Sequence, residues 1–296
     1  MKKIIVVIFS IIICSTGEIA IGEDFVPEEI TNEQVIKTLE SRDRRDKKIK
    51  ELSKKIQTEI QALTNHDWAG EYFLGNGLSG IQLLLAPESG YVLERNSDIG
   101  PLGCNFGIVS EKNGRICLSN NKIQTRQMFP GNAEEFIPIK WGTRKYLIPA
   151  DELVGFCNDI NEGAEPRKWN TGQYFLRRGD AKKKVTGFPV VPKGFRTYLL
   201  ERPIEAQIVA VDSPAPRARD CEDWKYPVTL NVGKNHGLLP GMKLYLLNPD
   251  RFVGPVIIKN VENMESEGII SQSGRKNTAP VIGSKLSTHS SRWDRK

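Results

Sequence analysis

Side chains that commonly do chemistry are sparse in this chain of 296 residues. Its histidines are His66, His236 and His289. A Ser-His-Asp hydrolase needs an imidazole oriented beside its nucleophile, and none of the three stands in a sequence context that indicates one. Ser79 lies in Gly-Leu-Ser-Gly rather than in the G-x-S-x-G of a nucleophile elbow. We therefore predict no serine hydrolase.

Acidic residues leave one class of enzyme open. Glycoside hydrolases use two carboxyl groups about 5–9.5 Å apart in a cleft. The candidates in the central region are Glu71, Glu94, Glu134, Glu135 and Asp151. Because the sequence does not place any two of them at this distance, we favour a non-catalytic protein. A hydrolase of cell-envelope polymers that uses these carboxylates is the alternative.

Motifs for metals and nucleotides add no further candidate. The chain contains no H-E-x-x-H, no P-loop and no EF-hand loop. Residues 75–80 match G-x-G-x-x-G, but we expect strands rather than a helix to follow them. We therefore predict no metal and no cofactor.

A basic segment near residue 180 is the candidate binding site. We expect a hairpin with strands at 173–178 and 184–191, and its turn region is rich in positive charge. The basic residues are Arg177, Arg178, Lys182, Lys183 and Lys184. Trp169 and Tyr174 lie close by in the sequence and, if exposed, would offer rings on which sugars stack. As an alternative function, this segment would bind an anionic glycan or lipid surface through charge. A solvated charged face is the plainer interpretation.

The N-terminus has the layout of a secretory signal peptide. Two lysines precede an uninterrupted apolar run at 4–14, and small residues follow. Cleavage after Gly17 or after Gly22 fits those small residues, and retention as an anchor is the alternative. We therefore expect residues 1–22 to direct export, with a periplasmic or extracellular protein as the result.

The net charge is modest for an exported chain of this size. It is +6 for the whole sequence, and removal of residues 1–22 takes away two lysines and one glutamate, which leaves +5. This balance favours contact with anionic surfaces without demanding a polyanion. Together with the export signal, it disfavours nucleic acid as a partner.

Cysteine spacing predicts disulfides rather than a zinc site. Cys104, Cys117, Cys157 and Cys221 remain after residue 22. An even number of cysteines in an exported chain indicates disulfide bonds. Cys104 and Cys117 flank the turn signal Asn113-Gly114, so we pair them across a hairpin and pair Cys157 with Cys221. Buried thiols are the alternative.

A long helix is predicted over residues 32–63, within a helical arm at 23–66. Thr31 and Gln34 have the spacing of a capping box. Apolar residues then recur at helical spacing, at Val35, Ile36, Leu39, Ile49, Leu52, Ile56, Ile60 and Leu63. The basic residues at its centre are Arg42, Arg44, Arg45, Lys47 and Lys48. The narrow apolar stripe suits either a partner helix, in a coiled coil or oligomer formed through 32–63, or docking on the chain's own domain.

Residues 67–202 are predicted to form an antiparallel β-rich domain. Short apolar runs separated by Gly, Pro and Asn-Gly recur at roughly the 8–12-residue spacing of strands joined by tight turns. Residues 151–161 predict one short helix that stops at Gly163. The fold class is therefore mainly β, of the α+β type.

The last part of the chain predicts a small β-barrel at 203–288, followed by a loose polar tail at 289–296. Strands are expected at 204–211, 226–232, 243–247, 254–261, 268–271 and 282–286. So many short strands in so few residues need a closed or nearly closed barrel to protect their edges.

The turn motifs of this region carry a resemblance. A strand ends in Leu230-Asn231-Val232-Gly233, and Gly237-Leu238-Leu239-Pro240-Gly241-Met242 re-enters the sheet as G-x-x-x-G-M. This pattern resembles small β-barrel modules of bacterial envelope proteins, such as the C-terminal domain of the flagellar assembly protein T family. The resemblance implies structure or adhesion to partners, and it brings no catalytic residue. The stretch from Asp67 to Leu118 resembles the opening of uncharacterised secreted bacterial proteins, which brings no activity with it.

These observations together predict an exported, non-catalytic envelope protein. It would act as a docking or scaffold module through its helical arm and its β-barrel. The expected partners are other envelope proteins.

Overall fold

The computed structural model describes residues 32–75, 79–120, 134–166, 174–216, 224–247, 254–272 and 280–290. The predicted signal peptide lies outside these ranges. The chain divides after Asp46 into two compact units, Met1–Asp46 and Lys47–Lys296. No helix among the described residues is long and apolar enough to cross a bilayer.

Helix α1, Asn32–Ala62, confirms the predicted long helix. Within the second unit, Ile49 and Ile56 are 6 % and 0 % exposed, and Leu52 and Ile60 pack beside them. The wall that receives them consists of Leu84, Ala86, Val92 and Phe106. This part of the apolar stripe therefore packs on the chain's own sheet, so it is not available to a second helix.

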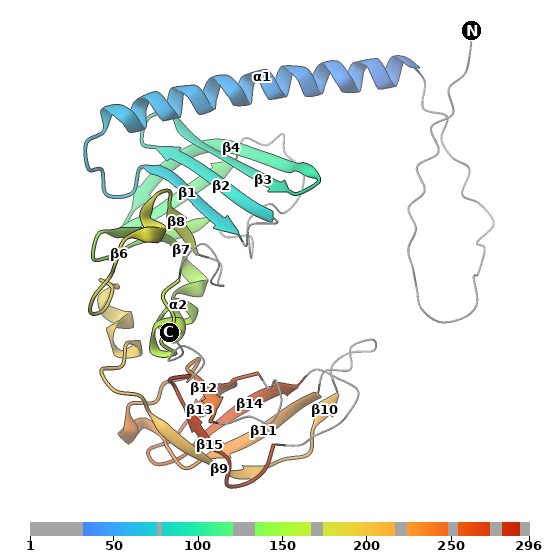
Figure 1. The fold of residues 1–296 in the computed structure, drawn as a ribbon. Coiled ribbons are helices and arrows are strands. Elements are labelled where there is room, and N and C mark those ends of the chain that lie inside the picture. The colour runs from blue at the N-terminus through green and yellow to red at the C-terminus, as the bar shows by residue number, and fades with distance from the viewer. Residues whose placement is uncertain are drawn as a thin grey trace, which may run out of the picture. The chain divides into compact units, whose positions relative to one another are not determined.

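Eight antiparallel strands close into a first barrel (Figure 1). They are β1 Gly70–Gly75, β2 Ser79–Ala86, β3 Gly90–Ser97, β4 Gly100–Lys112, β5 Arg115–Asn120, β6 Glu135–Trp141, β7 Arg144–Pro149 and β8 Phe175–Arg177. Each strand pairs with the next, and β8 pairs with both β7 and β1. Closure leaves no free edge. The predicted antiparallel β-rich fold of this region is thus confirmed, and its closure is new.

Tight turns join these strands where the sequence predicts them. Asn113 and Gly114 both have positive φ, 52° and 72°, between β4 and β5. Such angles match the twist of a two-residue hairpin, which is why Asn-Gly is favoured there. Gly142, with φ 57°, likewise adopts a positive φ in the turn between β6 and β7.

Side chains alternate between the inside and the outside of the barrel wall. Its interior is filled by large residues, among which Tyr72, Tyr91, Phe136 and Phe175 are 0 % exposed. The rings of Phe136 and Phe175 meet edge to face, 5.8 Å apart. The barrel interior is therefore a packed core.

The outer faces of β6, β7 and β8 are covered by helix α2, Leu153–Asn161, which follows the 3-10 turn η2, Ala150–Glu152. Apolar side chains on α2 pack on Tyr146, Ile148 and Leu176 of the wall. The predicted short helix is confirmed. It ends before Gly163, whose φ is 97°, a conformation that favours glycine.

The predicted hairpin at 173–178 and 184–191 is wrong. β8 is its one strand, and the chain continues through the 3-10 turns η3, Asp180–Lys182, and η4, Lys193–Tyr198. The segment 184–191 meets the sheet at a single bridge between Lys140 and Val190. Because β8 already has strand partners on both sides, it offers no edge to a second hairpin strand.

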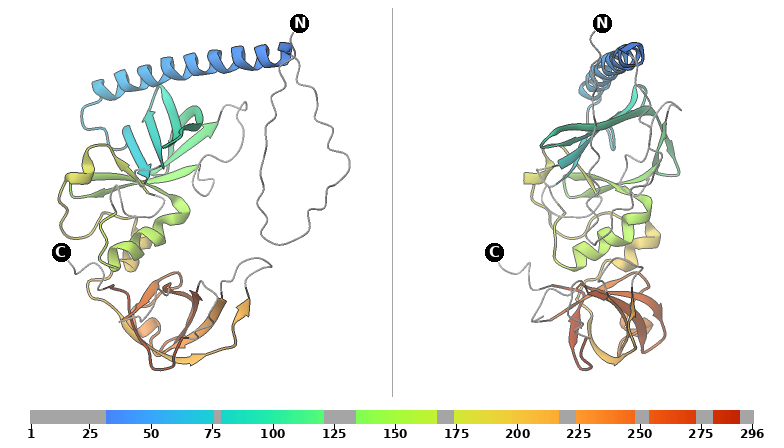
Figure 2. Two further views of the ribbon diagram at one scale, coloured as in Figure 1. Left: turned by 45° about the vertical axis from the view of Figure 1, so that its right-hand side comes forward. Right: turned by 90° about the vertical axis from the view of Figure 1, so that its right-hand side faces the viewer.

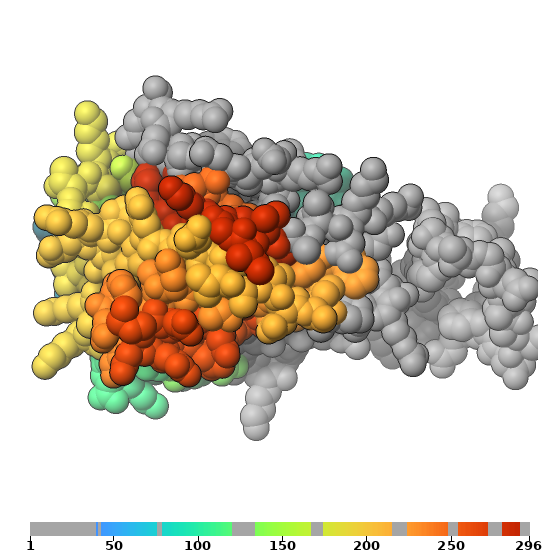
Figure 3. All heavy atoms as spheres, turned by 90° about the horizontal axis from the view of Figure 1, so that it is seen from below, coloured from blue at the N-terminus to red at the C-terminus, as the bar shows by residue number. Residues whose placement is uncertain are grey.

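Six strands close a second, smaller barrel, which confirms the predicted C-terminal barrel (Figure 2). They are β9 Glu205–Val211, β11 Trp224–Leu230, β12 Lys243–Leu246, β13 Val256–Val261, β14 Ser266–Gln272 and β15 Lys285–Ser287. A two-residue strand, β10 Ala215–Pro216, pairs with β11 outside the ring, and η5, Lys234–His236, follows β11. The orange and red atoms of this barrel form a continuous surface in Figure 3.

The glycines of the G-x-x-x-G-M motif serve the turn before β12. Gly237 and Gly241 have φ of 82° and 84°, which L-residues with side chains rarely adopt. Gly233 stands where a Cβ atom would clash with the carbonyl oxygen of Glu262. These residues are therefore explained by turn geometry and close backbone approach.

Helix α2 also hydrogen-bonds to the second barrel within the same unit. The amide of buried Asn158 donates from Nδ2 to the carbonyl of Gly241 at 2.8 Å and accepts at Oδ1 from the backbone N–H of Lys243 at 3.2 Å. The Tyr198 hydroxyl donates to the carbonyl of Pro240 at 3.1 Å. One asparagine thus satisfies two backbone groups of the turn that contains Gly241.

The predicted disulfide between Cys104 and Cys117 is wrong, although the hairpin between them exists. Cys117 pairs with Ser110 across β4 and β5, and Cys104 lies six residues further along β4. That separation is roughly 20 Å along a strand, whereas a disulfide joins Cα atoms about 4.4–6.8 Å apart. Cys157 is a buried thiol, and its burial raises its pKa to about 12. Its predicted partner, Cys221, lies outside the described residues.

Candidate functional site

A groove lies on the outer face of the first barrel, where β1, β2 and β8 meet. Strand alternation turns Tyr72 inward and its neighbours Glu71 and Phe73 outward. The register then places Phe73 opposite both Gln82 of β2 and Leu176 of β8. Helix α1 covers the apolar wall of β2 to β4 and α2 covers that of β6 to β8. The groove between these covered faces has a volume of about 420 Å³.

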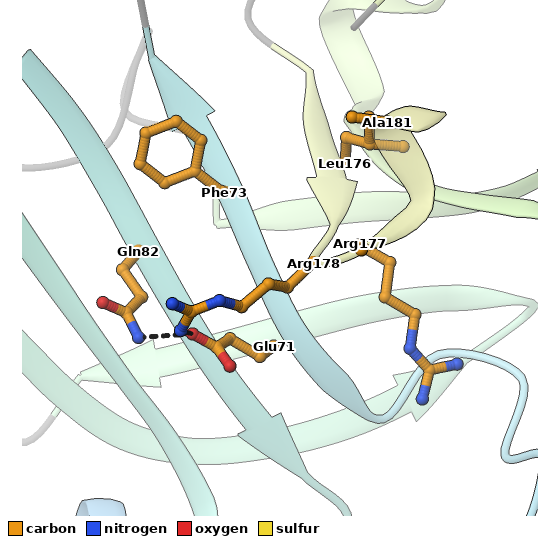
Figure 4. Close-up of a pocket in the computed structure, with 8 residues that line it drawn as sticks. Glu71, Phe73, Gln82, Leu176, Arg177, Arg178 and Ala181 are labelled. Carbon is orange, nitrogen blue, oxygen red and sulfur yellow. Dashed lines mark hydrogen bonds and ion pairs between the residues drawn. The ribbon is translucent and has the colours of Figure 1, made fainter. Parts of the chain in front are cut away.

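One end of the groove is polar (Figure 4). Arg178 forms an ion pair through Nη1 with Oε1 of Glu71, and Gln82 donates from Nε2 to the same oxygen at 2.7 Å. The side chain of Arg178 is 70 % exposed and that of Glu71 is 23 % exposed. The backbone N–H of Arg178 also donates to the carbonyl of Glu71 at 2.8 Å. The groove therefore presents a charge-compensated, hydrogen-bonding end to solvent.

The other side of the groove is apolar. Leu176 and Ala181 line it together with Phe73. The Phe73 ring lies over Gly80, where a Cβ atom would be 2.5 Å from its Cζ atom. Gly75 pairs with Gly80 across β1 and β2. Gly75 and Gly80, the first and last glycines of the G-x-G-x-x-G stretch, thus make room for an aromatic ring on a sheet.

The predicted basic residues do not form one patch. Arg177 of β8 pairs with Tyr72 of β1, so both residues lie on the inner face of the barrel wall. The guanidinium of Arg177 packs against Gly70, where an added Cβ atom would lie 2.9 Å from its Nε. In Figure 4 its side chain points away from that of Arg178. Lys183 forms an ion pair with Asp180 at 2.5 Å between Nζ and Oδ1.

The remaining two predicted lysines, Lys182 and Lys184, are exposed and form no ion pair with a described residue. Two of the five basic residues are therefore paired with acids. Arg177 is also among the residues that line the groove, with its side chain directed away from that of Arg178 (Figure 4).

Buried groups hold this basic loop in place. Arg144 is 0 % exposed, donates from Nε to the carbonyl of Lys183 at 2.7 Å and pairs with Glu165 at 3.1 Å. Asp180, 3 % exposed, accepts at Oδ2 from the backbone N–H of Lys145 at 2.9 Å. The loop is thus fixed to the barrel by charge-assisted hydrogen bonds.

Tyr174 is a core residue and not an exposed ring for stacking. It is 7 % exposed, and its ring meets that of Phe156 edge to face at 5.2 Å. Burial raises the pKa of its hydroxyl, and the charge of Asp159 raises it further. Trp169 lies outside the described residues.

The carboxylates considered for a hydrolase do not all line the groove. Glu71 lines the groove, and Glu94 stands opposite Gln82 on β3. Glu135 pairs with Arg115 at 2.7 Å. Glu134 and Asp151 are exposed. Glu71 is thus the one acid of the five that lines the described groove.

The described residues contain no group of three or more His, Cys, Asp or Glu side chains that could hold a metal ion. The groove combines the Phe73 ring, the aliphatic side chains of Leu176 and Ala181, and the Glu71–Arg178 ion pair. Such a lining suits a ligand that has an apolar body and a polar end. Sequence reasoning missed Phe73 and Gln82. The alternation of β1 would have grouped Glu71 with Phe73, but only the barrel register adds Gln82 and Leu176.

Comparisons with known proteins add no relative. A scan against protein-family models gives no match, and searches among curated proteins and solved structures give none either. The resemblances noted from the sequence therefore stay predictions.

Proposed function

We propose that the protein is an exported, non-catalytic docking or scaffold module of the cell envelope, which binds other envelope proteins through the start of α1 and through its second barrel. The observation that carries the proposal is that the boundary between the two compact units falls within α1. Its residues from Lys47 onward belong to the unit that contains both barrels, whereas its residues up to Asp46 belong to the other unit.

The sequence of the first part of α1 suits a docking element. Val35, Ile36 and Leu39 recur at helical spacing. A helix that carries an apolar stripe is stabilised when the stripe is buried against a partner. The later stripe, around Ile49 and Ile56, has its partner in the barrel wall. A groove or helix of another envelope protein would serve the earlier one.

The second barrel supports a scaffold role through its surface. Val209, Val281 and Ile282 are 41 %, 69 % and 62 % exposed. The backbone N–H of Gly283 donates to the carbonyl of Ile208 at 2.8 Å, so the turn bearing Val281 and Ile282 lies beside the strand that bears Val209. Exposed apolar side chains that gather on a closed, rigid barrel favour a protein-binding surface.

The test is crosslinking of the tagged chain in cells, followed by mass spectrometry. Ile36→Ser with Leu39→Ser should abolish capture of specific envelope proteins that the unaltered chain captures. Substitution is preferred to deletion of 32–63. The deletion would also remove Ile49 and Ile56, which pack on the barrel wall, and would expose that wall. The matched control, Lys37→Gln with Thr38→Ser, changes polar residues of the same segment and should keep capture.

Two outcomes discriminate further. Loss of capture with Val281→Ser and Ile282→Ser would assign part of the interface to the barrel. Capture that survives both apolar variants would refute docking through these surfaces. Export is tested separately by N-terminal sequencing of the protein from the periplasm or medium, where a new terminus after Gly17 or Gly22 is expected.

A further inference from the structure

The docked half of α1 displays a row of lysines. Lys47, Lys50 and Lys54, called here the lysine row, have the i, i+3, i+7 spacing that places residues on one side of a helix. All three are exposed. Because Ile49 and Ile56 are buried against the barrel wall, the orientation of this half of α1 is fixed. The lysine row therefore stays exposed to solvent.

The charge of this row is offset only in part by Glu51, which is exposed on the same side of the helix, four positions after Lys47 and three before Lys54. Residues 47–61 contain five lysines and two glutamates, a net charge of +3. One of the glutamates, Glu59, is engaged elsewhere, since its carboxylate accepts from the backbone N–H groups of Glu88 and Ser89 at 2.9 and 2.8 Å. No residue of the lysine row forms an ion pair within the described part of the chain.

The chemistry of this face limits its partner. Its exposed residues are Lys47, Lys50, Glu51, Lys54, Gln57, Thr58 and Gln61. Protein interfaces are enriched in aromatic residues and depleted of lysine, and sugars are commonly held by stacked rings, of which α1 has none. Lysine is a flexible point charge that suits phosphates without demanding a fixed geometry. Clusters of basic residues on an amphipathic helix attract anionic lipid headgroups.

We propose that the lysine row of α1 binds the phosphate headgroups of an anionic bilayer surface. The apolar face of the helix stays on the barrel, so the contact is electrostatic and peripheral, without insertion. The predicted basic loop is a poorer candidate, because Arg178 and Lys183 are paired with Glu71 and Asp180. This binding is independent of docking through residues 32–46, so either proposal can fail alone.

The test is cosedimentation of the full chain with two kinds of vesicle. One contains phosphatidylcholine alone and the other contains about a third phosphatidylglycerol, at about 50 mM salt, where charges act over more than 10 Å. The apolar run at 4–14 would bind both kinds alike, so the ratio of the two affinities isolates the electrostatic contribution. Each lysine near the surface contributes about fivefold. Lys47→Gln, Lys50→Gln and Lys54→Gln together should therefore lower the ratio roughly 100-fold.

Matched variants control the test. Lys182→Gln with Lys184→Gln removes two exposed lysines from the basic loop and should leave the ratio unchanged. Replacing the lysine row by three arginines keeps the charge and should keep binding. Circular dichroism of each variant verifies that α1 remains folded.

Three results would overturn the proposal. The whole chain could bind both vesicles equally at low salt, the triple glutamine variant could bind like the unaltered chain, or binding could persist at about 0.5 M salt, where screening is nearly complete. A fourth arm uses soluble polygalacturonate. Loss of polygalacturonate binding in the triple variant, without vesicle discrimination by the unaltered chain, would assign the lysine row to an acidic glycan instead.

Discussion

The basic loop around residue 180 and the lysine row of α1 have similar charge in the sequence but differ in the structure. In the loop, Arg178 pairs with Glu71 and Lys183 pairs with Asp180. On the helix, Lys47, Lys50 and Lys54 are exposed and form no ion pair within the described residues. The number of charges is therefore a poor guide to their availability.

The difference has a structural cause. The loop follows β8, the strand that closes the first barrel, and its charges fasten that closure to β1 and β7. The helix is held by apolar side chains on its inner face and by the Glu59 carboxylate, which accepts two backbone hydrogen bonds from the barrel. The lysine row takes no part in these contacts. Each prediction below disturbs one side of this comparison.

The largest effect is expected in the loop, from Arg144→Met. The variant removes a fully buried guanidinium and leaves the Lys183 carbonyl and the Glu165 carboxylate without it. Breaking a buried charge pair costs about 3–5 kcal/mol, measured as the free energy of unfolding in urea. Arg115→Met, which breaks the exposed pair with Glu135, should cost below about 1 kcal/mol. Equal costs would mean that Arg144 does not anchor the loop.

A somewhat smaller effect is expected on the helix side, from Ile56→Ala. Ile56 is 0 % exposed between α1 and the barrel wall. The cavity left by such a truncation costs about 2–4 kcal/mol, again by urea unfolding. The neighbouring exposed variant Gln57→Ala should stay within about 0.5 kcal/mol. A neutral Ile56→Ala would contradict the docking of this half of α1.

A pH-dependent effect is expected from Glu59→Gln. Burial alone would raise the pKa of Glu59, but hydrogen bonds from Ser89 and Glu88 and the charge of Lys55 outweigh it, so the pKa lies below 4.5. A carboxylate with a depressed pKa stabilises the fold above its unfolded pKa and loses that stabilisation as pH falls through the folded value. The variant should lose about 1 kcal/mol at neutral pH. The gap to the unaltered chain should narrow in urea unfolding experiments as the pH falls through the lowered pKa of Glu59.

The smallest effect is expected from Lys182→Gln with Lys184→Gln. Both side chains are exposed and have no described ion-pair partner. Their loss should change the free energy of unfolding by less than about 0.5 kcal/mol in the urea assay. A large loss would show that these lysines serve the loop after all, and the contrast with the lysine row would then fail.

Local features could be predicted from the sequence because they depend on neighbouring residues. The helix over 32–63 is observed at Asn32–Ala62, and the turn at Asn113-Gly114 lies where its φ preference requires. The closed C-terminal barrel followed from many short strands whose edges need partners. Such predictions rest on periodicity and turn chemistry, which act within a few residues.

Other features could not be predicted because they join distant residues. The sequence predicts a strand at 173–178, and β8 lies within it. The predicted partner of that strand was 184–191, whereas β8 pairs with β7 and β1 and closes a barrel of eight strands. Cys104 and Cys117 flank a real turn, but the register sets Cys117 opposite Ser110. Tyr174 lies near charged residues in the sequence, which suggests exposure, but its side chain is buried in the core.

The sequence by itself determined the class of fold, the long helix and the turns, since helical and strand periods are properties of the local backbone. The tertiary structure decided which charges remain available and where a groove forms. Glu71 and Arg178 are 107 positions apart, and only closure of the barrel brings them together. An ion pair of this kind depends on the register of several strands at once, which no local pattern encodes.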